Sequence, residues 1–221
     1  MAYPTFTQRL AYAKRWRSRR GERLAALWAK PLSLRGALDL FFAGLDYVGF
    51  SDLYEATTTL FAPRSRPLTP RERALLKPYF GNSIPWDLIR IDERAWVGPR
   101  FANLCYVSLH TINSWGPMSD HVLVHEVVHV WQYTHRGAAY IPRALYAQTT
   151  EMGYNYGGLM ELDAAYELED FNYEQQADII EDAFRLANGY QAQWEPGRGA
   201  EILPYYQPYL AEIRAANYQP W

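Results

Sequence analysis

Apolar residues along this chain recur mostly at helical spacing, and only two short stretches resemble strands. In residues 6–29, four apolar side chains fall on one side of a basic helix: Phe6, Leu10, Ala13 and Trp16. Pro31 would end this helix, because proline lacks the backbone N–H that the helix needs. The apolar segment Leu34–Phe50 predicts a second helix, with Gly44 as the candidate break.

The middle of the chain begins with a loop and then changes to shorter elements. Residues 62–70 contain three prolines and predict that loop. Thr69 suits the N-cap of a short helix that has Glu72 in its first turn, and Pro70 suits the first helical position. Residues 86–96 and 103–111 are rich in apolar and β-branched side chains and predict two strands.

The most informative segment runs from His121 to Tyr133, with no Gly or Pro in it. Such a long apolar run predicts a buried helix, which Ser119 or Asp120 would cap. Its valines would also suit a buried strand. In a helix His125 and His129 share one face, and Glu126 lies beside the first of them.

His125-Glu126-Val-Val-His129 is an H-E-x-x-H motif. Two imidazoles four residues apart on a helix can bind one zinc ion, and the intervening Glu can act as the base for a water that the zinc activates. The motif therefore predicts a metal-dependent hydrolase, most often a peptidase. The structural alternative is a core helix that carries two hydrogen-bonded histidines.

A third protein ligand is needed, and the sequence offers several. His135 lies six residues after His129, as in a longer three-histidine motif, but Gln132 stands where that motif has its glycine. Residues 170–188 form a strong helix candidate that Gly189 would cap, with an apolar stripe at 4-3-4-3 spacing: Tyr173, Ala177, Ile180, Phe184 and Ala187.

Two carboxylates border that stripe. Glu174 is placed to reach a buried metal, and Asp178, one turn later, is placed to orient a ligating histidine. The alternative is that both are ordinary solvated side chains. Other acidic candidates for the third ligand are Glu161, Asp163 and Asp170. His121, one turn before His125, is a candidate for an oxyanion or ligand-orienting group, or else an ordinary capping or surface histidine.

H-E-x-x-H followed by a helical E-x-x-x-D resembles the gluzincin branch of zinc peptidases. Residues 79–91, 124–133 and 171–180 together resemble the metallopeptidase domains of Rhs-type and type VI secretion spike-associated effector proteins. The resemblance implies that His125, His129 and Glu174 bind zinc and that Glu126 is the catalytic base. The chain departs from the family pattern in residues 100–120. This departure concerns the details of the strand edge that would bind the substrate, and it leaves the expected metal site unchanged.

The length and composition of the chain indicate its fold class and domain organisation. At 221 residues with 49% apolar content, we expect a sizeable core. The expected fold is α+β and zincin-like, mostly helical, with a small sheet beside the H-E-x-x-H helix. We expect residues 1–62 to form a basic helical segment packed on a zincin-like domain of residues 63–221. The single cysteine, Cys105, cannot form an internal disulfide and is expected to be a buried thiol.

Charge is distributed unevenly although the net charge is only −2. Residues 1–36 carry nine Lys/Arg and one Glu, whereas residues 151–195 carry eleven Asp/Glu and one Arg. The basic segment favours intramolecular docking or solvated faces, with a membrane surface as an alternative. Nucleic acid is an unlikely partner, because no DNA-binding module is recognisable.

No cleavable signal peptide and no transmembrane run are found in the sequence. We therefore expect the protein in the cytoplasm of the producing cell, or exported by a specialised secretion system. Residues 136–160 contain Gly, Pro and Tyr and suggest a gating or substrate loop, and the Pro- and Tyr-rich tail, residues 194–221, is expected to wrap the surface.

The expected function is a zinc-dependent endopeptidase, with the strand 103–111 binding the substrate backbone by strand addition. The family resemblance suggests a bacterial effector or toxin, whose partners would be a protein or peptide substrate, the secretion apparatus and a cognate immunity protein. The alternatives are a catalytically silent zinc-binding interaction module and a membrane-surface-binding helical protein.

Overall fold

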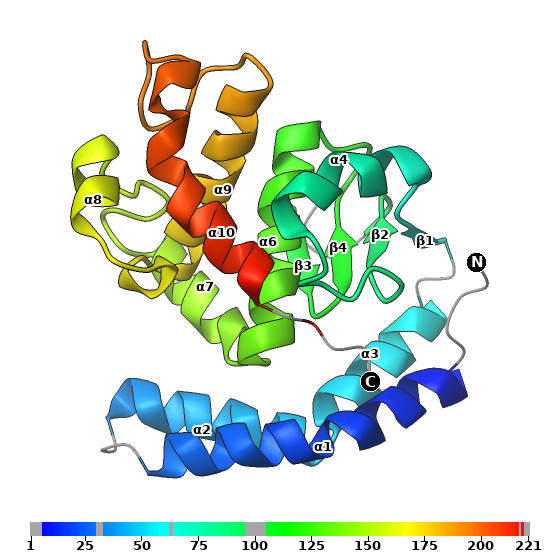
Figure 1. The fold of residues 1–221 in the computed structure, drawn as a ribbon. Coiled ribbons are helices and arrows are strands. Elements are labelled where there is room, and N and C mark those ends of the chain that lie inside the picture. The colour runs from blue at the N-terminus through cyan, green and yellow to red at the C-terminus, as the bar shows by residue number, and fades with distance from the viewer. Residues whose placement is uncertain (1–5, 30–32, 62–63, 96–104, 217, 219–221) are drawn as a thin grey trace.

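The protein is mostly helical and carries a small mixed sheet, which confirms the α+β class (Figure 1). The computed structural model describes residues 6–29, 33–61, 64–95, 105–216 and 218. None of the helices in these ranges combines the length and apolar character that a bilayer crossing requires.

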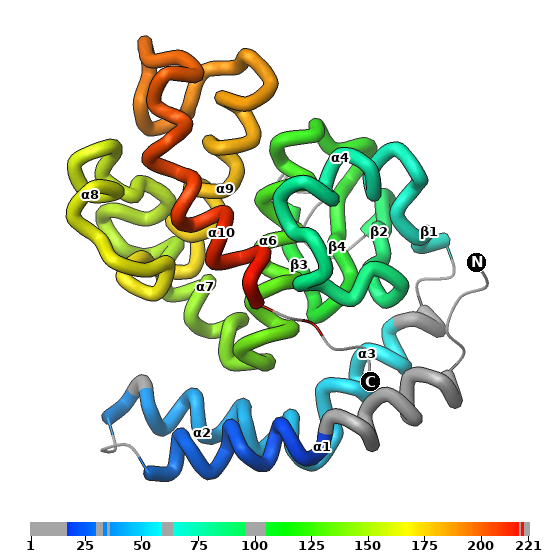
Figure 2. The backbone as a smooth tube through the Cα atoms, viewed as in Figure 1, coloured from blue at the N-terminus to red at the C-terminus, as the bar shows by residue number. Residues whose placement is uncertain are grey.

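Three helices form the N-terminal segment: α1 (Phe6–Trp28), α2 (Leu34–Tyr47) and α3 (Phe50–Phe61). α1 lies along both α2 and α3 (Figures 1 and 2). The break predicted at Gly44 is wrong, because Gly44 lies inside α2. The chain breaks at Gly49, whose φ of 82° lies in the left-handed region that glycine adopts easily. The expected end at Pro31 lies outside the described residues.

The sheet has the order β1-β2-β4-β3, with β2 and β4 parallel and the outer pairs antiparallel. Its strands are very short: β1 (Arg66–Pro67), β2 (Arg90–Asp92), β3 (Tyr106–Ser108) and β4 (Thr111–Asn113). The capping box of Thr69 and Glu72 begins α4 (Pro70–Phe80), as the sequence predicts.

Both predicted strands are too long. In the first, pairing starts only at Arg90, because residues 86–88 form a turn. In the second, Leu109 and His110 turn the chain, so that Thr111 already belongs to the next strand. Leu109 has a φ of 60°, which is unusual for a residue with a side chain. The positions before Cys105 in this segment lie outside the described residues.

Two long helices, α6 (Asp120–Arg136) and α9 (Tyr173–Ala187), pack against each other at the centre of the molecule (Figure 1). Around them lie α7 (Tyr140–Gln148), α8 (Leu159–Ala164), two 3-10 helices, η1 (Leu168–Asp170) and η2 (Ala200–Tyr206), and α10 (Gln207–Ala215). The expectation of a surface-wrapping tail is wrong, because η2 and α10 bury five large side chains in the core: Ile202, Tyr206, Tyr209, Leu210 and Ile213.

The N-terminal helices dock on the rest of the protein through polar groups. The carboxylate of Asp46 accepts a hydrogen bond from the backbone N–H of Ala138 at 2.7 Å, and Asp39 pairs with Arg143. Glu55 pairs with the His110 ring at 3.0 Å. Whether the chain divides into two domains at residues 62 and 63 stays a prediction.

Candidate metal centre

The helix that carries the H-E-x-x-H motif is buried on all sides. Its valines at 124, 127, 128 and 130 are fully inaccessible to solvent, as a helix through the middle of a core requires. The helix starts after Ser119, which lies at the N-cap position without a side-chain capping bond. Asp120, in the first turn, is held by Arg71. The alternative of a buried strand is therefore wrong.

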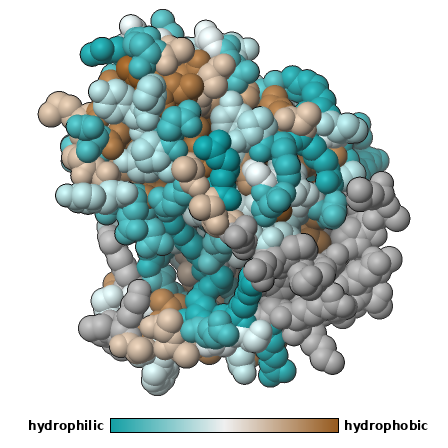
Figure 3. Space-filling view, viewed as in Figure 1, coloured by the Kyte–Doolittle hydropathy of each residue, from teal (hydrophilic) through white to brown (hydrophobic). Residues whose placement is uncertain are grey.

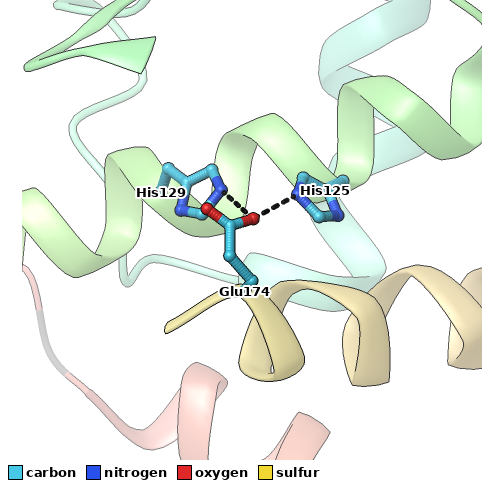
Figure 4. A group of neighbouring side chains, drawn as sticks. All are labelled: His125, His129 and Glu174. Atoms are coloured by element: carbon cyan, nitrogen blue, oxygen red, sulfur yellow. Dashed lines mark ion pairs between the residues drawn. The ribbon is translucent and has the colours of Figure 1, made fainter. Parts of the chain in front are cut away.

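His125 and His129 lie on the face of α6 that meets α9. Their ring centroids are 5.1 Å apart. The Nε2 atoms of both rings point toward the same oxygen of Glu174, Oε2, each at 3.4 Å (Figure 4). All three side chains are buried, and their ligand atoms lie within 4.8 Å of one another. The structure thus brings together the three residues that the sequence suggests as metal ligands.

Glu174 is positioned by the start of α9. The side chain of Asn172 caps this helix, accepting from the backbone N–H groups of Glu174 and Gln175, and Gln175 completes a capping box. Glu174 Oε1 accepts a hydrogen bond from the side-chain amide of Gln148 on α7 at 2.9 Å. Glu174 Oε2 is buried and has no hydrogen-bond partner among the described residues. A buried carboxylate oxygen without a donor is costly, which indicates that something else completes its environment.

The separations fit a tetrahedral metal ion. Zinc bonds of about 2.0–2.1 Å to nitrogen and oxygen place tetrahedral ligand atoms about 3.3–3.4 Å apart. Both distances from Nε2 to Oε2 have this value, 3.4 Å, which is longer than a good N–H···O hydrogen bond. The donor set of two imidazoles and one carboxylate is also the one that catalytic zinc commonly takes, with a fourth position left open.

Polar groups around the two imidazoles hold them in place. His125 Nδ1 lies 2.8 Å from Asp178 Oδ1 and 3.2 Å from Glu181 Oε2. His129 Nδ1 lies 2.8 Å from Gln132 Oε1, and the amide of Gln132 donates to the carbonyl of Tyr173. Because these partners are acceptors, each ring in its neutral form would place its proton on Nδ1 and leave the Nε2 lone pair available to a metal ion.

Glu126 is buried next to this centre, and one of its oxygens, Oε2, has no hydrogen-bond partner among the described residues. Burial raises its pKa, although the charges of His125 and His129 oppose the rise. A carboxylate with a raised pKa holds a proton more readily, as a general base at neutral pH must.

The charges of the three candidate ligands are coupled. Burial disfavours the Glu174 carboxylate, but the two imidazoles outweigh it and lower its pKa. Burial likewise disfavours the His125 cation, but Asp178, Glu174 and Glu181 outweigh it and raise the pKa of His125 well above its ordinary value. Without a metal, the centre is therefore held together as a buried ion pair.

The other sequence candidates lie elsewhere. His135 falls on another side of α6, because the helix continues through Gln132 where the three-histidine motif would turn, and its Nε2 lies 2.7 Å from the carbonyl of Ser83. Glu161 and Asp163 are exposed, and the Asp170 carboxylate accepts backbone N–H groups at the start of η1. Among the described residues, none of these four belongs to a group that could hold a metal.

His121 lies at the edge of the centre. Its Nδ1 is 2.8 Å from Glu181 Oε1, and its Nε2 is 3.0 Å from the Ser119 hydroxyl. Glu181 also approaches His125, so it connects the two histidines. A second group that could hold a metal, His125, Asp178 and Glu181, shares His125 with the first and uses its opposite ring nitrogen.

The sequence alone does not indicate that three further residues lie close to the candidate ligands. The ring of Tyr154 lies 6.0 Å from that of His125, and the ring of Tyr140 stacks on that of His129 at 6.3 Å. Gln148 holds Glu174 as described above. All three belong to residues 136–160, of which only part is a loop, because α7 occupies 140–148. Proximity to the histidines depends on how α7 packs on α9, and no spacing in the sequence indicates it.

Cys105 lies just before β3 and is only partly buried. Burial, together with the charge of Glu126, raises the pKa of its thiol to about 11, so the thiol is neutral and unreactive at physiological pH. β3 lies near the centre, because the Tyr140 hydroxyl donates to the Val107 carbonyl while its ring stacks on that of His129. β3 is an edge strand of the sheet.

Comparison with known proteins links the chain to type VI secretion spike proteins. It is similar to the type VI secretion system spike protein VgrG2b of Pseudomonas aeruginosa, with 27% identity over 161 residues, or 64% of this chain. The match covers only 15% of the length of that protein. No family model and no solved structure matches the chain.

Proposed function

We propose that this protein is a zinc-dependent endopeptidase of zincin-like fold that acts as an effector of a type VI secretion system. The observation that carries the proposal is the convergence of His125 Nε2 and His129 Nε2 on an otherwise unpartnered oxygen of Glu174. The similarity to a spike protein supports the secretion route. Association with the secretion apparatus, a protein substrate and a cognate immunity protein belong to the same proposal.

In the proposed mechanism, His125, His129 and Glu174 hold zinc, and Asp178 and Gln132 keep the two imidazoles in the ligating tautomer. Bound zinc would supply Lewis acidity, which makes water a nucleophile at neutral pH. Glu126 takes the proton from the attacking water and passes it to the leaving amine. Its buried position and raised pKa suit both transfers.

Substrate binding would use the exposed edge of the sheet. Among the described residues, β3 pairs with β4 on one side only, and we propose that its other side accepts an extended peptide by strand addition. The Tyr140 hydroxyl donates to the carbonyl of Val107 at 2.8 Å and accepts from the N–H of Leu109 at 3.2 Å. These bonds hold β3 in place beside the metal centre.

Tyr154 is the side chain that we assign to stabilising the oxyanion. It is 37% exposed and its ring lies close to that of His125; partial burial raises the pKa of its phenol to about 12, with the Glu174 charge adding to the rise. The phenol therefore stays protonated and can donate a hydrogen bond to a developing negative charge.

Replacement of the proposed base tests the enzyme directly. Glu126→Gln keeps the size of the side chain and removes the base, so cleavage of an unfolded protein such as casein should fall about 10²–10⁴-fold. Zinc content, measured by metal analysis, should stay at that of the wild type. Cleavage at the wild-type rate would contradict the mechanism. Zinc-loaded wild-type protein that cleaves nothing would favour the alternative of a zinc-binding interaction module.

Tyr154→Phe separates oxyanion stabilisation from binding. Loss of one such donor should lower kcat about 10²–10³-fold, with KM and zinc content little changed. Tyr166→Phe, at a fully exposed position outside the centre, serves as the matched control and should leave kcat unchanged. A Tyr154→Phe variant with wild-type kcat would remove Tyr154 from the mechanism.

A further inference from the structure

Two carboxylates lie within reach of one nitrogen of the His125 ring. His125 Nδ1 is 2.8 Å from Asp178 Oδ1 and 3.2 Å from Glu181 Oε2. The neutral ring carries a single N–H at this position, and one N–H makes its best hydrogen bond with one acceptor. The acceptor that takes this bond therefore sets the orientation of the ring and the direction of Nε2.

Each of the two carboxylates has a further partner of its own. Glu181 Oε1 accepts a hydrogen bond from Arg185 Nε at 2.9 Å and lies 2.8 Å from His121 Nδ1. Asp178 Oδ2 accepts a hydrogen bond from the indole Nε1 of Trp194 at 2.5 Å. Asp178 is buried, so its Oδ2 depends on this donor in place of water. With Oδ2 held by the indole, Oδ1 faces the imidazole as its closer acceptor.

The backbone that carries Trp194 is anchored on α9. Trp194 lies in the segment between α9 and η2, and Asp182 stands one turn after Asp178 on that helix. The Asp182 carboxylate accepts hydrogen bonds from the backbone N–H groups of Gln193 at 2.6 Å and Trp194 at 3.2 Å. It also accepts from the Tyr156 hydroxyl at 2.7 Å. Asp182 is 1% exposed, so water does not compete for these bonds.

A second anchor follows Trp194 directly. Glu195 Oε1 accepts from the backbone N–H of Leu159, the first residue of α8, at 2.7 Å. Ala192, two residues before Trp194, is buried, and the Trp194 ring packs partly against the core. In Figure 3 brown, apolar residues lie among teal ones at the top of the view, where Figure 1 draws the end of α9 and the orange segment after it. The segment is thus held on both sides of Trp194.

We infer that Trp194 is a positioning residue of the metal centre: through Asp178 it holds the His125 ring in the orientation that directs Nε2 to the metal. An indole N–H donates and cannot accept, so it keeps the facing Asp178 oxygen in the role of acceptor. A hydroxyl or an amide in its place could reverse the bond. The inference rests on the proposed zinc site and extends it to the segment that follows α9.

Zinc titration against a competing chelator tests the role of the indole. Trp194→Phe removes the N–H and keeps an aromatic ring, so zinc affinity should fall about 3–10-fold, less than loss of a direct partner of a ligating histidine costs. Trp86→Phe is the matched control, because Trp86 is also partly buried and its Nε1 donates to the carbonyl of Gly81 at 3.1 Å. The control should keep wild-type affinity. Equal affinity in wild type and Trp194→Phe would overturn the inference.

A double-mutant cycle separates positioning from packing. Asp178→Asn keeps the shape of the side chain and removes its charge, and zinc affinity should fall about 10–100-fold. If Trp194 acts through Asp178, adding Trp194→Phe to Asp178→Asn should cause no further loss. A Trp194 side chain that only packs would cost the same in both backgrounds, and that result would overturn the inference.

The metal-free protein tests the inference apart from the proposed function. A wild-type protein that binds no zinc would contradict the zinc enzyme and leave this measurement open. In ¹⁵N NMR spectra at one pH, Trp194→Phe should move the ring signals of His125, which are assigned by their loss in His125→Gln. The ring signals of His110, which pairs with Glu55, should stay in place. Trp86→Phe should move neither set. Unchanged His125 signals in Trp194→Phe would overturn the inference whether or not zinc binds.

Discussion

Two groups of buried carboxylates among the described residues differ in whether every oxygen has a hydrogen-bond partner. Beneath α2 and α3, Asp39, Asp46 and Glu55 are each at most 6% exposed, and each binds a donor of the core. Between α6 and α9, Glu126 and Glu174 are at most 5% exposed. One oxygen of each has no hydrogen-bond partner among the described residues.

This difference in hydrogen bonding distinguishes a carboxylate with a structural role from one at a candidate binding site. A buried carboxylate whose donors all come from the protein fixes one helix against another. A buried carboxylate oxygen that lacks a donor costs folding free energy, so its retention points to a ligand that completes it. The burial of a carboxylate alone therefore does not mark a candidate site. A buried carboxylate oxygen that has no hydrogen-bond donor does.

Removing Glu174 should have the largest effect on metal binding. Glu174→Ala deletes one of three ligands, so zinc affinity should fall about 10-fold or more. The metal-free variant should also melt below the metal-free wild type, because the substitution removes one side of the buried ion pair and leaves the Gln148 amide without its acceptor. Zinc titration and thermal melts with and without chelator measure both effects.

Glu169→Ala, at an exposed position just before α9, is the matched control and should keep full zinc affinity. Unchanged zinc affinity in Glu174→Ala would assign the third ligand to another residue. The alternative group of His125, Asp178 and Glu181 would then be the first to examine.

Removing Asp46 should lower stability without an effect on metal binding. Asp46→Ala leaves the Ala138 N–H and the Ser51 hydroxyl without their acceptor in a buried contact. The free energy of unfolding should drop by about 2–4 kcal/mol, which lowers Tm by roughly 5–10 °C, with zinc affinity unchanged.

Asp87→Ala removes an acidic residue whose pair with Arg73 is largely exposed, and it should cost about 1 kcal/mol or less. If Asp46→Ala were as mild as this control, the docking of the N-terminal helices would not depend on its buried carboxylates. Loss of zinc in Asp46→Ala would instead couple the two regions.

The smallest expected effect is a dependence on pH. The raised pKa of His125 contributes stability that is fully present below the unfolded pKa and is lost as pH rises through the folded pKa. The metal-free protein should therefore lose stability above neutral pH. Zinc requires neutral imidazoles, so its stabilisation grows over the same range.

The increase in Tm on adding zinc should thus be larger at pH 8 than at pH 6, by about 3 °C or more for each unit of pKa shift. Differential scanning calorimetry with and without zinc at the two pH values measures it. An increase in Tm that is the same at both would show that the metal-free centre is not an ion pair.

The sequence predicts the parts of the centre that depend on local spacing. His125, Glu126 and His129 follow from one helical motif, and the start of α9 follows from its apolar stripe together with the family resemblance. Tyr154 and Gln148 could not be predicted, because they reach the centre through the packing of α7 and the following loop. The strands were placed only coarsely, because elements of two or three residues are shorter than the alternation that would reveal them.

The N-terminal helices show a second limit. An amphipathic pattern predicts a helix, but the usual assumption that the apolar side faces inward is wrong for α2. Asp39 and Asp46 outcompete the leucines for the interior because Arg143 and the Ala138 N–H are there to receive them. These partners lie about a hundred residues away along the chain, where no periodicity connects them.

A single side chain, Tyr140, joins the sheet to the candidate metal ligands. Its hydroxyl bridges Val107 in β3 and Leu109 at the start of the β3–β4 turn, while its ring lies against His129. The position of a peptide bound along β3 relative to the His129 imidazole would therefore depend on one rigid phenol. The distance between the peptide backbone and that imidazole would be fixed by the size of the tyrosine side chain rather than by a flexible loop.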